Sequence, residues 1–304
     1  MDQFAPFLEA TVRTATPLAL AAIGESISER GGILNVGLEG AIMAGCFGAA
    51  AGAAAGGIGA GLAGGLLGGL LVGLLFGVMV VWLRADQIIT GTAVTLGSYG
   101  ATGVLQRLVF GDAGVALTIP TLAPLAIPGL SALPVIGRAL FTQHAMTYAT
   151  IALAPVAWWW LYRTHAGLAL RAVGEHASAA TAAGVVADRY RWVATLTGSA
   201  LGGLSGATLV LTVGTFSEQM SAGRGFIAIA IVALGRWTPQ GAALAALLFG
   251  AASALQYRFQ ATGSDVPYQL ILALPYLFTL VVLGLGVGRT GAPAGLARLD
   301  DVSR

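Results

Sequence analysis

Long apolar runs separated by short polar stretches dominate this chain. A helix needs about 20 apolar residues to cross the roughly 30 Å hydrocarbon core of a lipid bilayer, and several of the runs reach that length. The runs do not alternate apolar with polar residues, so they predict membrane-spanning helices and not the strands of a β-barrel. The apolar runs lie at residues 14–24, 33–56, 57–83, 88–109, 145–162, 192–213, 225–236, 240–257 and 268–287.

Two stretches interrupt this succession of spans. Run 225–236 is too short to cross a bilayer, and Pro239 and Gly241 follow it, so it predicts a half-helix. Residues 110–143 contain four prolines and predict a long surface loop with room for a re-entrant turn. The predicted fold class is an all-α membrane protein, a polytopic helical bundle of about 8–10 membrane segments that include broken or half-helices.

Composition agrees with a bilayer environment. Hydrophobic residues make up 57% of the chain and charged residues only 9%, whereas about 25% of the residues in a soluble domain are charged. We expect a single transmembrane domain, residues 1–304, which ends in a flexible tail at 289–304 where glycine, proline and aspartate gather.

Missing residue types exclude several kinds of chemistry. All 15 basic residues are arginine, and without lysine the chain forms neither a P-loop for ATP nor a Schiff base. A single cysteine, Cys46, excludes an internal disulfide and a thiolate metal cluster, and the three histidines are scattered over separate loops. The net charge of +2 leaves no basic face for nucleic acid. We expect no catalytic residue, no metal and no cofactor, so another subunit must hydrolyse any ATP.

Arginine placement predicts the orientation. If the long polar segment 164–191 is cytoplasmic, strict alternation of the spans places eight arginines inside and four outside, as the positive-inside rule favours. The C-terminus is then cytoplasmic, while the side of the N-terminus stays open. The inside set is Arg84, Arg163, Arg171, Arg189, Arg191, Arg289, Arg298 and Arg304, and the outside set is Arg107, Arg138, Arg224 and Arg258.

Glycines recur at every fourth position of run 57–83. Such a row lets two helix backbones approach closely, because lipid gives helices no hydrophobic reason to associate. The row drifts by roughly 40° around the helix at each step, so it can touch more than one neighbour. We interpret it as a packing face and not as a substrate-lining one. The row consists of Gly57, Gly61, Gly65, Gly69, Gly73 and Gly77.

The stretch "ISERGGILNVGLEG", residues 27–40, places acids, a base and an amide between two apolar runs. A charged acid at mid-membrane costs about 3 kcal/mol or more unless it is paired or faces a cavity. Asn35 and Glu39 share one helix face, and glycines such as Gly37 loosen the backbone around them, as in transporter sites. We expect these residues to line a path, whereas Glu25, Glu29 and Arg30 are expected at the headgroup level.

The polar segment 164–192 contains an alanine-rich centre. Residues 175–183 predict a short helix that begins after Gly174 and is closed by Gly184. Two interpretations remain open for this segment: a solvated connecting loop, or a stiff lever between two spans with an exposed surface for a partner.

Four phrases, "ISERGGILNVGLEGAIMAG", "GLALRAVGEHASAATAAGV", "GRGFIAIAIVALGRWTPQGA" and "LPYLFTLVVL", together resemble the permease subunits of bacterial ABC importers. The resemblance is to the ribose and branched-chain amino acid permease superfamily, and within it to the simple-sugar and nucleoside branch. The phrases occur in the family's order between about residues 24 and 284, so the likeness covers nearly the whole chain.

This resemblance implies a role for two groups of residues. Asn35, Gly37 and Glu39 match the broken element of the first half, and Arg224 and Phe226 belong to that of the second, which suggests a weak internal repeat around a translocation path. The segment that docks on the ATPase corresponds to residues 171–184, although the family's usual Asn-Pro is replaced here. The coupling residues are Arg171, Gly174, Glu175, His176 and Gly184.

The resemblance also implies partners and a location. We expect a multi-pass protein of the bacterial inner membrane, in contact with lipid, a cytoplasmic ABC ATPase, a second and non-identical permease, and a substrate-binding lipoprotein or periplasmic protein. Nucleosides are preferred over simple sugars as the solute. The alternative is an ion- or proton-coupled secondary transporter, which also uses broken helices. A lipid-modifying enzyme is a third candidate, but the clustered interfacial charges typical of one are missing.

Overall fold

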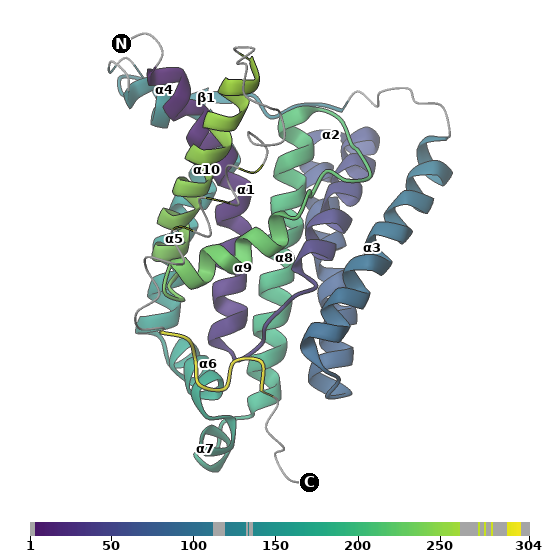
Figure 1. Cartoon of the computed structure of the whole chain (residues 1–304), viewed down its shortest axis with the longest axis vertical. Coiled ribbons are helices and arrows are strands. Elements are labelled where there is room, and N and C mark those ends of the chain that lie inside the picture. Colours follow the sequence, from purple (N-terminus) through teal and green to yellow (C-terminus); the bar gives the residue numbers. More distant parts are fainter. Residues whose placement is uncertain are drawn as a thin grey trace.

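The computed structural model is a bundle of helices that run mostly along one long axis (Figure 1). It confirms the predicted all-α membrane fold class. The structure describes residues 4–111, 119–131, 133, 136–261, 273, 277, 281 and 291–298.

The long helices follow the predicted apolar runs. Within the described residues, four helical segments are long and apolar enough to cross a membrane: 38–82, 87–110, 187–213 and 239–260. The predicted run 268–287 lies outside the described residues. The long helices are α1 (Phe4–Arg30), α2 (Leu38–Gly77) with its π-helical continuation η1 (Val78–Trp82), α3 (Gln87–Phe110), α5 (Ala145–Arg163), α8 (Ala187–Val213) and α10 (Pro239–Ala261).

The shorter elements lie between these spans. The half-helix predicted at 225–236 is present as α9 (Arg224–Leu234), which crosses the middle of the bundle obliquely (Figure 1). The predicted loop 110–143 is not wholly irregular. It contains β1 (Pro124–Ala126) and α4 (Ile136–Phe141), and β1 pairs antiparallel with β2 (Thr142–His144) so that Pro124 lies opposite His144. The remaining short helices are α6 (His165–Glu175) and α7 (Ala177–Ala182).

Helix α2 is a hairpin and not one straight helix. The backbone leaves the helical conformation at Gly56 (φ −146°) and Gly57 (φ 77°), where the two predicted runs meet. Beyond this turn the second arm returns beside the first, and Gly64 packs so closely on Gly48 that a Cβ at either position would collide with the backbone of the other. One hairpin therefore supplies two antiparallel crossings.

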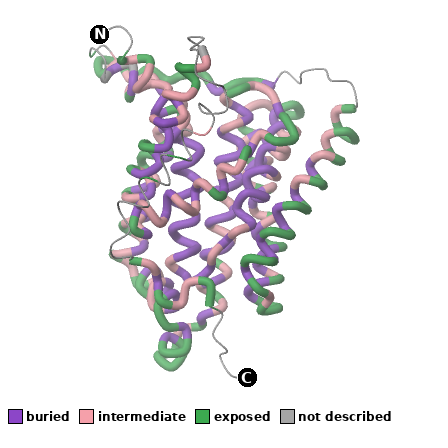
Figure 2. Tube along the Cα trace, in the orientation of Figure 1, coloured by how far each residue is buried: buried purple, intermediate pink, exposed green. Residues whose placement is uncertain are grey.

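The glycine row of the second arm packs on α8, except at Gly57, where a Cβ would meet open space. Gly61 lies near Leu211 and Gly77 near Trp192, so the arm and α8 are antiparallel. This glycine face gives the second arm two backbone neighbours, the first arm and α8. Figure 2 shows that α8 and the lower part of α1 are buried in the centre of the bundle, whereas α3 at its edge is mostly exposed.

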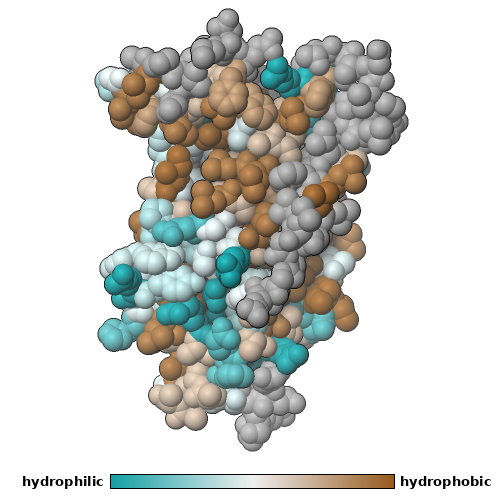
Figure 3. Space-filling model, turned by 60° about the vertical axis from the view of Figure 1, so that its left-hand side comes forward, coloured by the Kyte–Doolittle hydropathy of each residue, from teal (hydrophilic) through white to brown (hydrophobic). Residues whose placement is uncertain are grey.

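The two ends of the bundle differ. Helices α6 and α7 lie at one end, and α1 begins at the opposite end, near α4 and β1 (Figure 1). On the face shown in Figure 3, hydrophilic residues gather in the half that carries α6 and α7, and hydrophobic ones in the other half. We call the end of the bundle that carries α6 and α7 the polar end.

One prediction about the polar end requires correction. The helix predicted at 175–183 begins two residues later, because Glu175 ends α6 and His176 adopts an extended conformation (φ −149°, ψ 94°) before α7. Of the tail expected to be flexible at 289–304, residues 291–298 are described, and there the amide of Gly295 donates to the Gly174 carbonyl at 2.9 Å.

Candidate functional site

The segment Gly31–Gly37 is unwound and folds back beside α1. Its turn passes through Gly32, whose φ of 85° favours glycine. The backbone amide of Asn35 donates to Glu25 Oε1 at 2.9 Å, and that of Leu34 donates to Gln87 Oε1 at 2.7 Å. Inside a membrane, unwound backbone is tolerated only where other groups satisfy its amides and carbonyls. Side chains of α1 and α3 perform that task here.

Glu39 binds the start of the half-helix α9 from across the interior. Its Oε1 accepts hydrogen bonds from the Tyr99 hydroxyl at 2.6 Å and the Gly223 amide at 2.8 Å, and its Oε2 accepts one from the Gly225 amide at 2.6 Å. A helix N-terminus carries partial positive charge and unpaired amides, so a carboxylate is stabilised there. Glu39 is 1% exposed and acts as the N-cap that α9 lacks in its own sequence.

The opposite end of α9 is held by Arg30 and Glu29. Arg30 Nε donates to the carbonyl of Trp237 at 2.7 Å, and the Trp237 indole Nε1 donates to Glu29 Oε2. Arg236 and Trp237, in the link between α9 and α10, both have φ of 55°, a left-handed conformation that residues other than glycine rarely adopt. A cation beside a helix C-terminus matches its partial negative charge.

Together Glu29, Arg30 and Glu39 form what we call the α9 clamp. The acid Glu39 lies at the positive end of α9, and the base Arg30 lies beyond its negative end. Each favourable charge at a helix end contributes about 0.3–1 kcal/mol, and up to about 2 when partly buried. The polar residues of the 27–40 stretch therefore fix a helix that is too short to span the membrane.

Glu25 and Glu29, expected at the headgroup level, are buried inside the bundle. Their exposed fractions are 0% and 2%, and both contact protein groups: Glu25 the Asn35 amide, and Glu29 the Trp237 indole. These partners lie 10 and 208 residues away in the sequence, so the sequence alone did not indicate them.

The predicted path residues are brought together only in part. Asn35 Nδ2 donates to Ser199 Oγ at 3.0 Å, and Gly37 faces α2 and α3, where a Cβ would lie 3.3 Å from Phe76. Arg224 Nη1 donates to the carbonyl of Met220 within its own turn. Phe226 has 49% of its surface exposed.

The predicted coupling residues lie on the elbow formed by α6 and α7. Arg171 is attached to the bundle, because its Nε donates to the Leu161 carbonyl at 3.0 Å. Gly174 is buried against the Arg30 carbonyl, with no room for a Cβ. Glu175 and His176 are exposed, and Gly184 (φ 88°) closes α7. The elbow thus has one face on the bundle and one face to solvent.

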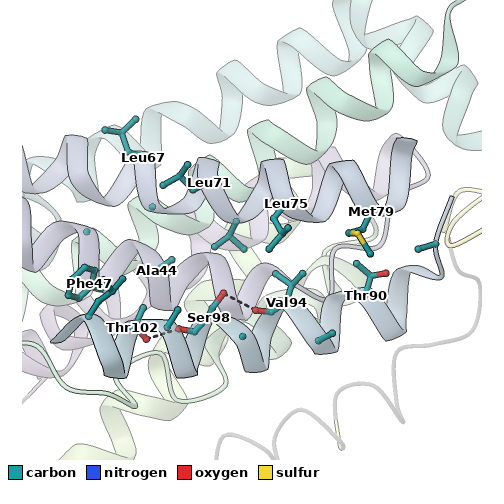
Figure 4. Close-up of a pocket in the computed structure, with 18 of the residues that line it drawn as sticks. Ala44, Phe47, Leu67, Leu71, Leu75, Met79, Thr90, Val94, Ser98 and Thr102 are labelled. Carbon is teal, nitrogen blue, oxygen red and sulfur yellow. Dashed lines mark hydrogen bonds between the residues drawn. The ribbon is translucent and has the colours of Figure 1, made fainter. Parts of the chain in front are cut away.

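A large groove between α2 and α3 lacks the character of a solute site. Its volume is about 970 Å³, and apolar side chains such as Phe47, Leu71 and Met79 line it (Figure 4). Two hydroxyls in its wall already donate hydrogen bonds, because Ser98 donates to the Val94 carbonyl at 2.8 Å and Thr102 to the Ser98 carbonyl at 2.7 Å. The groove suits an apolar occupant better than a sugar or a nucleoside.

The clamp predicts an effect at Trp237. Trp237→Phe keeps an aromatic ring but removes the indole donor, so it leaves Glu29 Oε2 buried without a partner. We expect the free energy of unfolding to fall by about 1–3 kcal/mol, the usual cost of a buried acceptor left without a partner. Thermal unfolding in detergent measures the loss. Trp82→Phe, at a side chain that is 73% exposed, is the control, and equal melting temperatures for the two variants contradict the prediction.

The chain matches a known family over most of its length. Residues 7–285 match the family model described as "Branched-chain amino acid transport system / permease component". Over 290 residues the chain is 39% identical to a nucleoside ABC transporter permease protein of Lactococcus lactis, covering 92% of this chain and 91% of that protein.

Two further relatives are similar in extent. A guanosine ABC transporter permease protein of Bacillus subtilis is 34% identical over 301 residues. The match covers 93% of this chain and 92% of that protein. A putative glucose ABC transporter permease protein of Haloferax volcanii is 34% identical over 317 residues, with coverage of 95% and 94%. No solved structure matches the chain.

Proposed function

Because this chain belongs to the family of branched-chain amino acid transport system permease components, we propose that it forms the membrane path of a nucleoside importer. It is a permease subunit of an ABC transporter, a multi-pass protein of the bacterial inner membrane that works with a cytoplasmic ATPase and a substrate-binding protein. The names of two relatives, for a nucleoside and for guanosine, support nucleosides as the solute.

The observation that carries this proposal is the half-helix α9, held at both ends inside the bundle. Half-helices near the middle of the membrane form the binding sites of many transporters, and their N-termini often bind anionic groups of the solute. In this chain Glu39 already occupies the N-terminus of α9. The path therefore offers no anion site there, which suits an uncharged solute. The gate of this proposal is α9 with the unwound segment Gly31–Gly37.

The elbow of α6 and α7 provides the contact for the ATPase. Glu175 and His176 face solvent, while Gly174 touches the backbone of Arg30, whose side chain holds the far end of α9. A movement of the elbow is thus passed to the gate through two contacts: from Gly174 to the Arg30 backbone, and from the Arg30 side chain to the Trp237 carbonyl. The arginine-rich sequence at this end supports a cytoplasmic position for the elbow and for the C-terminus.

A second, non-identical permease subunit is expected beside this one, as in nucleoside importers of this kind. The ion-coupled alternative is disfavoured by the bonding of Glu39. Three hydrogen bonds occupy its two oxygens, which leaves little capacity to coordinate a coupling ion.

Transport by the reconstituted complex tests the function. Vesicles with this chain, its second permease, the ATPase and the binding protein should take up labelled guanosine with ATP and not without it. Labelled glucose, offered in parallel, should accumulate far more slowly. Steady uptake by this chain alone, driven by a sodium or pH gradient without nucleotide, would overturn the proposal, and preferred uptake of glucose would change the solute to a sugar.

A further inference from the structure

Residues 291–298, which we call the C-terminal strap, join the elbow to the turn after α1. The amide of Gly295 donates to the Gly174 carbonyl at 2.9 Å, and that of Ala297 donates to the Gly32 carbonyl at 3.2 Å. The amide of Ala294 donates to Glu175 Oε2 at 3.1 Å. The strap is the third backbone segment in a crossing whose other two members are the elbow and the α1–α2 turn.

Three glycines permit this crossing. A Cβ on Gly32 would lie 3.4 Å from both Gly174 Cα and the Gly295 carbonyl oxygen, and a Cβ on Gly295 would lie only 2.8 Å from the Gly174 carbonyl oxygen. The three backbones therefore touch without side chains between them. Close-packed contacts of this kind transmit displacement, because they have little room to deform.

The strap also reaches the link between α9 and α10. Gly291 lies beside the Arg236 carbonyl, 3.7 Å from where its Cβ would be. Pro293 is buried, and Ala292 and Leu296 pack against the core cluster that includes Trp237. One part of the strap is thus bonded to the elbow and another part packs near the end of the gate helix.

We propose that the C-terminal strap is a positioning element that carries the movement of the α6–α7 elbow to the C-terminal end of α9. This inference rests on the proposed function, since it assumes that the ATPase moves the elbow. The strap runs parallel to the direct contact between Gly174 and Arg30, so it makes the elbow, the α1–α2 turn and the α9–α10 link move as one unit. Without it, only the direct contact between Gly174 and Arg30 links the elbow to α9.

The test compares ATP hydrolysis with uptake in the complete reconstituted complex. One variant ends after residue 290, and a second, Gly295→Ala, adds a methyl group against the Gly174 carbonyl. Both should keep the ATPase bound and hydrolysing ATP, but the solute moved per ATP should fall about fivefold or more. The matched control is Gly100→Ala in α3, where a Cβ meets open space, and its ratio should equal that of the unmodified chain.

The outcomes separate the strap from the proposed function. If both strap variants move as much solute per ATP as the unmodified chain, the inference is overturned. It is also overturned if the ATPase is lost on purification, because the strap would then be a docking surface. If the shortened chain fails to fold, Gly295→Ala decides alone. If the unmodified complex shows no ATP-dependent uptake, the proposed function fails and the strap inference fails with it.

Discussion

Glu39→Gln is expected to lower solute uptake about tenfold while the chain still assembles with its ATPase. Glutamine offers one acceptor oxygen, and its NH₂ group replaces the oxygen that binds one of the three donors of Glu39. An amide of α9 is then buried without a partner, at a cost of about 1–3 kcal/mol, and 1.4 kcal/mol corresponds to a factor of ten. Since α9 keeps its Arg30 contact, we expect misplacement of the helix and not unfolding of the bundle. Uptake per co-purified ATPase measures this effect.

Two further variants serve as comparisons for Glu39→Gln. Tyr99→Phe removes one donor to Glu39 and leaves both α9 amides bonded, so its effect on uptake should be smaller. Glu218→Gln changes a half-exposed acid that lies 3.9 Å from Arg107 and should leave uptake unchanged. Unchanged uptake in Glu39→Gln would contradict the prediction and show that Glu39 does not influence the gate.

Gly203→Val should strongly destabilise the helix bundle. Gly203 lies where α8 meets the second arm of α2, and a Cβ there would collide with the Gly65 carbonyl and lie 2.8 Å from Gly69 Cα. The first arm is equally close, because Gly45 contacts the Gly203 backbone. Overpacking a tight site costs about 1–3 kcal/mol and occasionally more, and valine brings three carbons into this one. We expect a cost of about 3 kcal/mol or more, visible as a lower melting temperature and less folded protein.

Gly100→Val provides the matched control for Gly203→Val. It places the same side chain in another long helix, α3, at a position where a Cβ meets open space. Because valine costs below about 0.7 kcal/mol in a helix and glycine about 1 kcal/mol, both relative to alanine, Gly100→Val should not lower the stability. Equal stability of the two valine variants would show that the glycine contacts between α8 and the hairpin do not hold the bundle together.

The local patterns of the sequence predicted the spans well. Run length and composition placed the helices, Pro239 and Gly241 marked the end of the half-helix, and the fourfold glycine spacing indicated a packing face. The four phrases that resemble ABC importer permeases led to the family that the family match confirms. These features depend on neighbours a few residues away, which a sequence displays directly.

The candidate site could not be predicted in the same way. The burial of Glu29 could not be predicted because its partner, Trp237, is distant in the sequence and carries no sign of its role. The bonds of the strap use backbone amides, which every residue type except proline offers, so no sequence pattern indicates them. Glu39 and Asn35 stood out as polar residues in an apolar run, but only the fold tells which helix end Glu39 binds.

The left-handed conformation of Arg236 and Trp237 makes the joint between α9 and α10 a strained segment of backbone. Two consecutive residues in that region cost on the order of 1–3 kcal/mol each, which the Arg30 and Glu29 contacts offset in this conformation. In the proposed function, a displacement of Arg30 that breaks these contacts lets the two residues relax, and the relaxation offsets part of the free energy that the lost hydrogen bonds contributed. The strained joint then lowers the free energy needed to displace α9.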